Sequence, residues 1–345
     1  MTFNPFYSIS DKLLENIKRV NSLVNQLNRT RFSSVILLEF ERIAREVSTF
    51  ASTSIEGNPL PLTEVKKVLK SKPANARNSE KEVLNYNHAL QELNDKLETG
   101  NLSLSLELIL KIQGQVTRGL LPKHQSGKLR QQHVVVNDPK TGNMVFLPPD
   151  YQDVHSLLEE LVKYVVDKRN KIDPLILAGI FHKQMVIIHP FMDGNGRATR
   201  LGTKVLLAEM GLNTFNLFSF ENYYNKNVTK YFETVGEFGN YYELVDKVDF
   251  TKWIEYFIEG IIDELLRVQK LLPKLSLDPN SKLEKHHEAI LQFIGENGFI
   301  KDKDYAKLTD RAKATRALDF QKLIELKIIE RKGKGRATYY ILKEI

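Results

Sequence analysis

The chain has 345 residues, of which 42% are hydrophobic and 27% charged, and its net charge is +7. These fractions exclude a disordered, collagen-like or disulfide-stapled chain, and at roughly 150 residues per domain the length predicts two or three units. Cysteine is absent, which excludes thiol chemistry and zinc sites built on cysteine. No window approaches about 18 uninterrupted apolar residues and no signal peptide is visible, so we expect a cytoplasmic protein without a membrane segment.

The first third of the chain predicts a series of amphipathic helices. In residues 34–50, apolar side chains recur at steps of three and four, which is typical of a helix with one buried face. Thr63 begins a second, shorter helix, and residues 79–97 and 104–120 repeat the helical pattern. We therefore expect residues 1–110 to form an N-terminal helical region.

Residues 133–146 interrupt this pattern. Two runs of apolar and β-branched residues flank the segment N-D-P-K-T-G-N, which is rich in turn-forming residues, so a β-hairpin is predicted. A two-stranded hairpin is only marginally stable by itself. We expect it to pack against another part of the chain or to serve a binding function.

Two helices are predicted in the middle of the chain. Asp173 and Pro174 form a favourable N-cap and first-turn pair, and the residues that follow are apolar on almost every side, which is typical of a buried helix. A second helix is expected from about Gly196 to Met210, with Gly211 as its stop signal.

The last part of the chain has a different composition. Residues 272–280 are polar and contain proline, which predicts a linker, and residues 281–345 predict three helices and two short strands around K-G-K-G-R. This is the order of a winged helix-turn-helix domain. Residues 301–336 hold twelve basic and six acidic residues, so most of the net charge lies there, either on a solvated face or facing an anionic partner.

A winged helix can bind DNA or protein, and the sequence leaves both alternatives open. In a DNA complex the third helix would enter the major groove and the wing would contact phosphates. The basic residues that this role would use are Arg311, Lys313, Arg316, Lys332, Lys334 and Arg336.

The string H-P-F-M-D-G-N-G-R-A-T-R at residues 189–200 joins the two central helices. Its glycines permit a tight turn, and the free N–H groups at the start of the next helix attract anions. Arg197 and Arg200 lie three residues apart and can reach the same anion. Asp193 can hold Mg²⁺ beside phosphates, and His189 can transfer a proton near neutral pH. The string therefore predicts phosphoryl or nucleotidyl transfer.

This string resembles the signature H-x-F-x-[D/E]-G-N-G-R-x-x-R of Fic-domain proteins at every defined position. The resemblance implies an all-α fold with a Fic-type helical core and a hairpin flap, and an enzyme that moves AMP from ATP to a Tyr, Thr or Ser hydroxyl of a target protein. It implies that His189 is the catalytic base, that Asp193 holds Mg²⁺, and that Arg200 binds the γ-phosphate. The nucleotide-binding residues that it implies are Asp193, Gly194, Asn195, Gly196, Arg197, Arg200 and Tyr231, with Phe191 as a core anchor.

The resemblance extends beyond this loop. G-K-L-R at residues 127–130 and F-L-P-P at residues 146–149 resemble the flap region of the family, where a strand edge would pair with a target segment. The flap residues implied are Val134, Val135, Val136 and Asn137. The segment N-K-N-V-T-K-Y-F at residues 225–232 resembles a family segment near the adenine. Tyr231 is therefore an expected adenine or ribose contact, with a partly buried helix tyrosine as the alternative.

A second motif lies upstream, where S-T-S-I-E-G at residues 52–57 resembles the inhibitory pattern [S/T]-x-x-x-E-[G/N] of many Fic proteins. Ser52 and Glu56 lie one helical turn apart on one face, and Gly57 ends the helix. By this resemblance Glu56 would enter the nucleotide site and pair bidentately with Arg200, which removes the partner of the γ-phosphate. We expect the inhibitory helix near residues 45–58 and the Fic core at residues 111–270.

Three alternatives remain open from the sequence. The chain could be a nucleotide-sensing winged-helix transcriptional regulator, or an enzyme that removes AMP and uses Glu56 to position water. It could also transfer another phosphate-containing group. The expected partners are ATP and the target hydroxyl, with DNA or protein at the winged helix and a homodimer as further alternatives.

Overall fold

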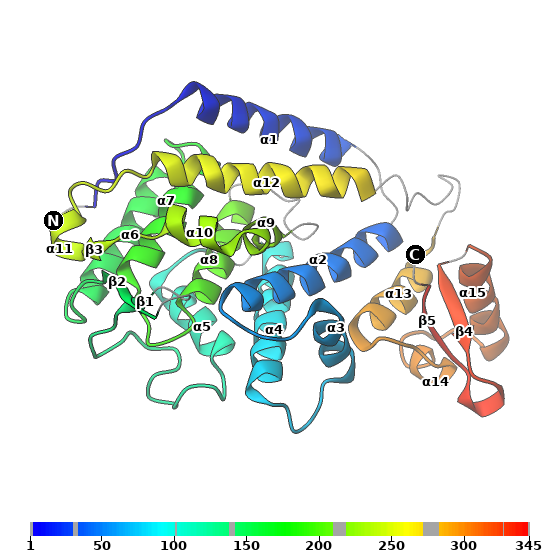
Figure 1. Cartoon of the computed structure of the whole chain (residues 1–345). Helices are drawn as coiled ribbons and strands as arrows, with labels where there is room; N and C mark the ends of the chain where they lie inside the picture. Colours follow the sequence, from blue (N-terminus) through cyan, green and yellow to red (C-terminus); the bar gives the residue numbers. More distant parts are fainter. Residues whose placement is uncertain are drawn as a thin grey trace. The chain divides into compact units, whose positions relative to one another are not determined.

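The computed structural model describes residues 3–29, 34–100, 102–137, 142–209, 219–271, 283–326 and 328–343. The described residues are mostly helical, which confirms the predicted fold class (Figure 1). The chain divides into two compact units, Met1–Leu27 with Arg45–Leu266 and Asn28–Ala44 with Arg267–Ile345. The predicted linker at residues 272–280 lies outside the described residues.

The helices before residue 272 form the larger part of the chain. They are α1 (Asp11–Arg29), α2 (Ser34–Ile55), α3 (Leu62–Ser71), α4 (Asn78–Glu98), α5 (Leu106–Val116), α6 (Val154–Lys168), α7 (Pro174–Ile188), α8 (Asn195–Glu209), α9 (Glu221–Lys226), α10 (Val228–Val235), α11 (Tyr241–Leu244) and α12 (Thr251–Leu271). None of the described helices is long and apolar enough to cross a lipid bilayer.

Helix α7 is the centre of the first unit. Its N-cap is Asp173, whose side chain accepts a hydrogen bond from Leu175 N–H at 2.9 Å, as the sequence predicts. Almost every side chain of α7 is buried, because α6, α8 and α12 surround it. Trp253 of α12 donates from its indole Nε1 to the Gly179 carbonyl at 2.8 Å, so the two helices pack closely where α7 has no side chain.

Helix α8 runs beside α7, and the loop that joins them carries the predicted chemistry. The helix begins at Asn195. Its predicted end at Met210 and Gly211 lies outside the described residues.

The predicted hairpin forms from β1 (Val136–Asn137) and β2 (Met144–Leu147), which pair in antiparallel fashion; its turn, residues 138–141, lies outside the described residues. A third strand, β3 (Gly239–Asn240), pairs in parallel with β2. The hairpin is therefore supported by a strand that the sequence did not predict. Val134 and Val135 precede β1 and are not part of its ladder, which corrects the expected extent of the strand edge.

The second unit contains α13 (Lys285–Asn297), α14 (Asp302–Tyr305), α15 (Lys313–Glu325), the short helix η3 (Gly335–Ala337) and the antiparallel pair β4 (Ile329–Lys332) and β5 (Tyr339–Leu342). Ile300 bridges to Tyr340 of β5 through two backbone hydrogen bonds, and the Tyr340 ring stacks on Phe320 of α15. These contacts enclose a small hydrophobic core between three helices and the strand pair. The order of elements is that of the expected winged helix.

Candidate active site

His189 lies at the C-terminal end of buried helix α7. It is the C-cap residue at φ +48°, and its N–H donates to the Met185 carbonyl at 3.1 Å. Arg130 donates from Nε to the His189 carbonyl at 2.9 Å, and the Arg130 N–H donates to the Pro190 carbonyl at 2.9 Å. A left-handed conformation outside glycine costs about 1–3 kcal/mol, so these bonds hold the imidazole in a position that the chain would not adopt alone.

The surroundings of His189 keep its imidazole neutral. Burial lowers the pKa of His189 to about 4, although the carboxylates of Glu56 and Asp193 act in the opposite direction. At neutral pH the ring therefore carries no charge and can accept a proton.

The loop after His189 is braced by Asn195. Its side chain pairs with the backbone of Phe191 in both directions: Phe191 N–H donates to Oδ1 at 2.9 Å, and Nδ2 donates to the Phe191 carbonyl at 2.8 Å. The Phe191 ring is fully buried, as its expected anchoring role requires. Gly194 has φ +80°, and a Cβ there would lie 2.8 Å from Thr117 Cγ2, so only glycine fits. Asn195 thus shapes the loop through its side chain.

Arg200 is fully buried and contacts Ser52 of α2 and Glu56, which follows α2. Its Nη2 lies 2.8 Å from Glu56 Oε1 and donates to the Ser52 carbonyl at 2.8 Å, while Nε donates to Ser52 Oγ at 2.7 Å. The expected bidentate pair is wrong, because Glu56 makes one contact to Arg200 and Ser52 accepts the other two bonds. Burial by itself would lower the pKa of Arg200, but Glu56 and nearby phenols raise it overall.

The carboxylate of Glu56 lies at the N-terminus of α8. A Cβ at residue 196 would overlap Glu56 Oε1, so Gly196 leaves the space that this carboxylate fills. The Glu56 side chain is 24% exposed although its partner Arg200 is fully buried. Glu56 therefore takes the position where an anion would meet Arg200 and the helix N-terminus.

Arg197 is also paired with carboxylates. Its Nη2 lies 2.9 Å from Asp193 Oδ1, and its Nη1 lies 2.8 Å from Oε1 of Glu82 on α4. Asp193 Oδ1 also accepts from Gly194 N–H at 2.6 Å. Within the described residues, the contacts to the Asp193 carboxylate all involve its Oδ1 atom. Oδ2 therefore fits the role of a single oxygen ligand to Mg²⁺.

Tyr231 does not lie at an open surface. It is 1% exposed, its ring stacks on Tyr224, and its hydroxyl lies 3.1 Å from Nε2 of the buried His182. Burial raises the pKa of Tyr231 to about 12. The expected adenine or ribose contact would need this cluster to open, so the arrangement favours the alternative of a buried helix tyrosine.

Three residues that shape the loop were not predicted as site residues. Arg130 belongs to G-K-L-R, which we assigned to the flap alone, and Glu82 carries no local signal because its partner is distant in sequence. Gln113 donates from Nε2 to the Asp193 carbonyl at 3.0 Å and accepts from Gly127 N–H at 2.5 Å. A glutamine within the apolar stripe of α5 was a visible signal for such a buried role.

A buried polar cluster continues the contact between α2 and α8. Lys204 Nζ donates to Ser48 Oγ at 3.0 Å and lies 3.2 Å from Glu221 Oε1. Glu221 also accepts from the hydroxyls of Tyr86 and Ser219, at 2.9 and 2.7 Å. Because Ser48, Ser52 and Glu56 recur at steps of four, one face of α2 meets Lys204 and Arg200 in turn.

Arg311, just before α15, and Arg316, on α15, are engaged within the second unit. Arg311 Nε lies 2.9 Å from Asp319 Oδ2, and Arg316 contacts both oxygens of Asp302, at 2.8 and 2.9 Å. In the wing, Lys332 pairs with Glu330 at 2.9 Å. Lys313 and Lys334 are exposed, and the Arg336 side chain lies outside the described residues.

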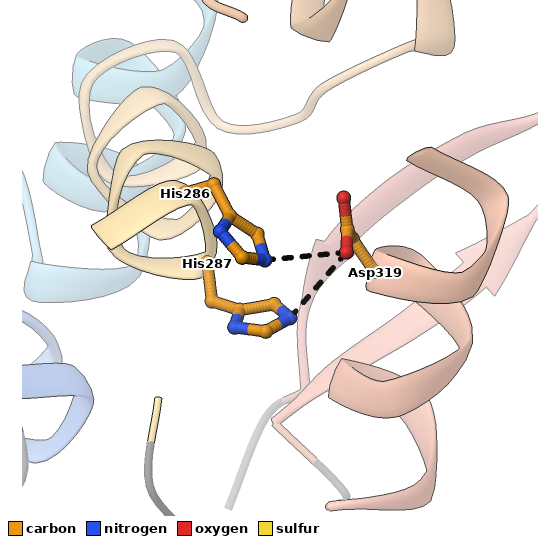
Figure 2. A group of neighbouring side chains, drawn as sticks. All are labelled: His286, His287 and Asp319. Carbon is orange, nitrogen blue, oxygen red and sulfur yellow. Dashed lines mark ion pairs between the residues drawn. The ribbon is translucent and has the colours of Figure 1, made fainter. Parts of the chain in front are cut away.

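His286, His287 and Asp319 gather on α13 and α15 with a spacing that could suit a metal ion (Figure 2). Nε2 of His286 lies 3.3 Å from Asp319 Oδ1, and Nε2 of His287 lies 3.7 Å from the same oxygen. However, His287 Nδ1 accepts a hydrogen bond from Glu284 N–H at 3.1 Å, so the proton of the neutral ring must be on Nε2. Arg311 already balances the Asp319 charge. The donor set therefore fits a hydrogen-bonded carboxylate better than a metal site.

Comparison with known proteins agrees with this geometry. Residues 103–207 match the Fic/DOC family model. Protein adenylyltransferase fic-1 of Caenorhabditis briggsae is 29% identical over 216 residues, covering 60% of this chain and 40% of the relative. Protein adenylyltransferase Fic of Culex quinquefasciatus is 28% identical over 230 residues, covering 61% of this chain and 44% of that relative. The chain thus spans less than half the length of these curated relatives.

The solved structures that resemble the chain share its fold. A Fic family protein from Desulfovibrio desulfuricans G20 has a TM-score of 0.64 at 20% identity, covering 99% of this chain and 98% of that one. A Fic-1 fragment from C. elegans has a TM-score of 0.60 at 21% identity, covering 76% of this chain and 74% of that fragment. Residues 103–207 are therefore similar to a Fic domain, and the chain is similar to Fic protein adenylyltransferases.

Proposed function

We propose that the protein transfers AMP from ATP to a hydroxyl group of a target protein. The observation that carries this proposal is the loop of residues 189–200, where a neutral His189 ends α7 and two buried arginines follow in the first turns of α8. The hydroxyl oxygen of the target attacks the α-phosphorus, the bond to pyrophosphate breaks, and His189 accepts the hydroxyl proton. Pyrophosphate leaves, and Arg197 and Arg200 stabilise the phosphate charge.

Mg²⁺ fits this proposal as a cofactor that Asp193 would hold through Oδ2. Bound with ATP, it would neutralise part of the triphosphate charge. Arg130 acts on the same loop by fixing the His189 backbone, so the imidazole is held in place before the nucleotide binds.

The contact of Glu56 with Arg200 supports an inhibited state. A γ-phosphate that binds Arg200 must displace Glu56, because one anion at a time can occupy the space above Gly196. Ser52 holds Arg200 in the orientation that suits Glu56. We therefore assign Ser52, Glu56 and Gly57 to an inhibitory segment, in which Gly57, at φ +90°, lies in the turn that follows α2.

The edge of β1 is the proposed docking site for the target segment. Val136 and Asn137 pair with β2 on one side, and β1 is the outer strand of the sheet. An extended peptide could add to this edge through main-chain hydrogen bonds. Val134 and Val135 would extend that edge when a target segment binds.

The test is incubation with Mg²⁺ and ATP labelled at the α-phosphate, followed by mass spectrometry of the labelled peptides. Glu56→Gly should raise self-modification severalfold over the parent, and adding His189→Ala should abolish it while ATP binding persists. A fully active His189→Ala protein would exclude the proposed base. Release of AMP from a modified target by the parent chain would instead support the AMP-removing alternative.

We propose that the second unit binds a protein rather than DNA. Arg311 and Arg316 are held by Asp319 and Asp302, while Leu318 on α15 is 63% exposed. An apolar side chain on this helix suits a protein partner better than phosphates. Duplex DNA binding at about 50 mM salt that weakens steeply with added salt would overturn this proposal.

A further inference from the structure

Glu82 connects the nucleotide loop with the segment that carries Glu56. Its Oε1 lies 2.8 Å from Arg197 Nη1, and its Oε2 accepts from Asn58 Nδ2 at 2.7 Å. Asn58 follows Glu56 by two residues. One carboxylate of α4 therefore contacts both a predicted phosphate ligand and the residue that directly follows the inhibitory segment.

The burial of Arg197 makes this contact energetically important. Arg197 is 3% exposed, and the removal of one partner from a buried ion pair leaves an uncompensated charge. Asp193 alone would hold one edge of the guanidinium, and that carboxylate is also the expected ligand of Mg²⁺. Glu82 is thus the partner of Arg197 that can stay in place while Asp193 serves the nucleotide.

Asn58 is itself firmly held. Its Nδ2 also donates to the Ser79 carbonyl at 2.9 Å, its Oδ1 accepts from Leu60 N–H at 3.1 Å, and its own N–H donates to the Thr53 carbonyl at 3.1 Å. A shift of the chain after Glu56 must therefore move Asn58, and with it the hydrogen bond to Glu82.

We propose that Glu82 is a positioning residue that holds Arg197 in the nucleotide site and links it, through Asn58, to the inhibitory segment. This inference rests on the proposed function. It assigns to α4 a role in nucleotide binding that no motif in the sequence carries.

The first test compares Glu82→Gln with Glu80→Gln in the Glu56→Gly protein. Glu80 lies on the same helix and pairs with Arg77, away from Arg197, so it is a matched control. Isothermal titration calorimetry with Mg²⁺ and ATP should show about tenfold weaker binding for Glu82→Gln, because the buried Arg197 loses the charge of one of its two carboxylate partners. The KM for ATP should rise in parallel with little change in kcat, whereas Glu80→Gln should stay within about twofold of its parent.

The second test separates the link to the inhibitory segment. Asn58→Ala should raise self-modification about fivefold when Glu56 is present, because the segment loses an anchor. In the Glu56→Gly protein the same substitution should leave ATP affinity within about twofold. An unchanged rate for Asn58→Ala would exclude the link.

Equal ATP affinity for Glu82→Gln and Glu80→Gln would overturn the positioning role. If Glu82→Gln does not fold, Glu82→Asp keeps the charge but shortens the side chain, and it should weaken ATP binding by a smaller factor. ATP affinity equal to that of the parent would then overturn the role. Calorimetry requires no AMP transfer, so the absence of transfer in every variant would refute the proposed function without deciding this inference.

Discussion

Two pairs of arginines in this protein have similar sequence signals and different surroundings. Arg197 and Arg200 lie on α8 of the Fic domain, and Arg311 and Arg316 lie at or near α15 of the second unit. Arg197 and Arg200 were expected to bind phosphate, and Arg311 and Arg316 were expected, in the DNA alternative, on or just before the helix that enters the major groove. Each of the four guanidiniums is paired with a carboxylate. A basic residue in a plausible motif is therefore insufficient to indicate an anion site.

Glu56, the partner of Arg200, and Asp319, the partner of Arg311, differ in how easily they can leave. Glu56 is 24% exposed, lies just after the end of α2 and is 144 residues from Arg200 in sequence. Asp319 has a side chain that is 5% exposed and belongs to the same helix as the core residue Phe320. Displacing Glu56 requires a local shift, whereas displacing Asp319 would disturb a domain core. Arg200 can therefore exchange its protein carboxylate for a ligand phosphate more easily than Arg311 can.

The strongest test of this difference replaces one arginine of each pair. In the Glu56→Gly protein, Arg200→Ala should lower AMP transfer about 100-fold, since a buried group that stabilises phosphate charge is lost. Arg316→Ala should change the rate less than about twofold. Initial rates with labelled ATP measure both, and an equal loss for the two variants would contradict the comparison.

A second test compares the carboxylates. Asp319→Asn should lower the free energy of unfolding of the second unit by about 2 kcal/mol, because Arg311 loses a nearly buried partner. Glu56→Gln should lower stability by a smaller amount, because Ser52 still accepts two hydrogen bonds from the buried Arg200. Hydrogen exchange of the backbone amides in α13–α15 measures the loss of stability for Asp319→Asn, and exchange in α2 measures it for Glu56→Gln. The reverse order of the two losses would show that Glu56 is the structural carboxylate.

A smaller effect is expected at Ser52, which accepts two hydrogen bonds from Arg200, one of them through Oγ. Ser52→Ala should raise self-modification about fivefold when Glu56 is present, because one bond that favours the inhibited state is removed. In the Glu56→Gly protein, the same substitution should have almost no effect on the rate. If it raises the rate equally in both proteins, Ser52 does not act through the inhibitory contact.

The smallest expected effect is on the pH dependence of activity. Burial lowers the pKa of one histidine in each region, His189 and His287. An ordinary histidine base would be half protonated near pH 6.5. Since the pKa of His189 is about 4, kcat/KM of the Glu56→Gly protein should be nearly constant from pH 8 to 6 and fall only in more acidic buffer. Half-loss of activity near pH 6.5 would contradict this.

The same pKa shift has a consequence for stability. The unfolded chain binds a proton at His189 near pH 6.5, whereas the folded chain does so only near pH 4. The stabilising contribution of the neutral ring is therefore fully present above pH 6.5 and is lost as the pH falls toward 4. A His189→Ala protein should show a weaker loss of stability over this range.

Local patterns were sufficient for much of the fold. The buried helix α7, its Asp173 cap and the hairpin strands follow from apolar periodicity and turn residues, which act over a few positions. The loop of residues 189–200 was also recognisable, because its residues lie together in the sequence. The partners of that loop were not, since Glu82 and Arg130 reach it only after α4 and the flap region fold against α7 and α8.

By itself the sequence determined that a histidine, a carboxylate and two arginines meet at one turn between two helices, because neighbours in sequence stay neighbours in space. It also placed Ser52 and Glu56 on one helical face. Only the tertiary structure decided which carboxylates hold these arginines, and that Arg311 and Arg316 are engaged within their own unit. Ion pairs between buried groups depend on which elements pack together, and that packing depends on contacts throughout the hydrophobic core.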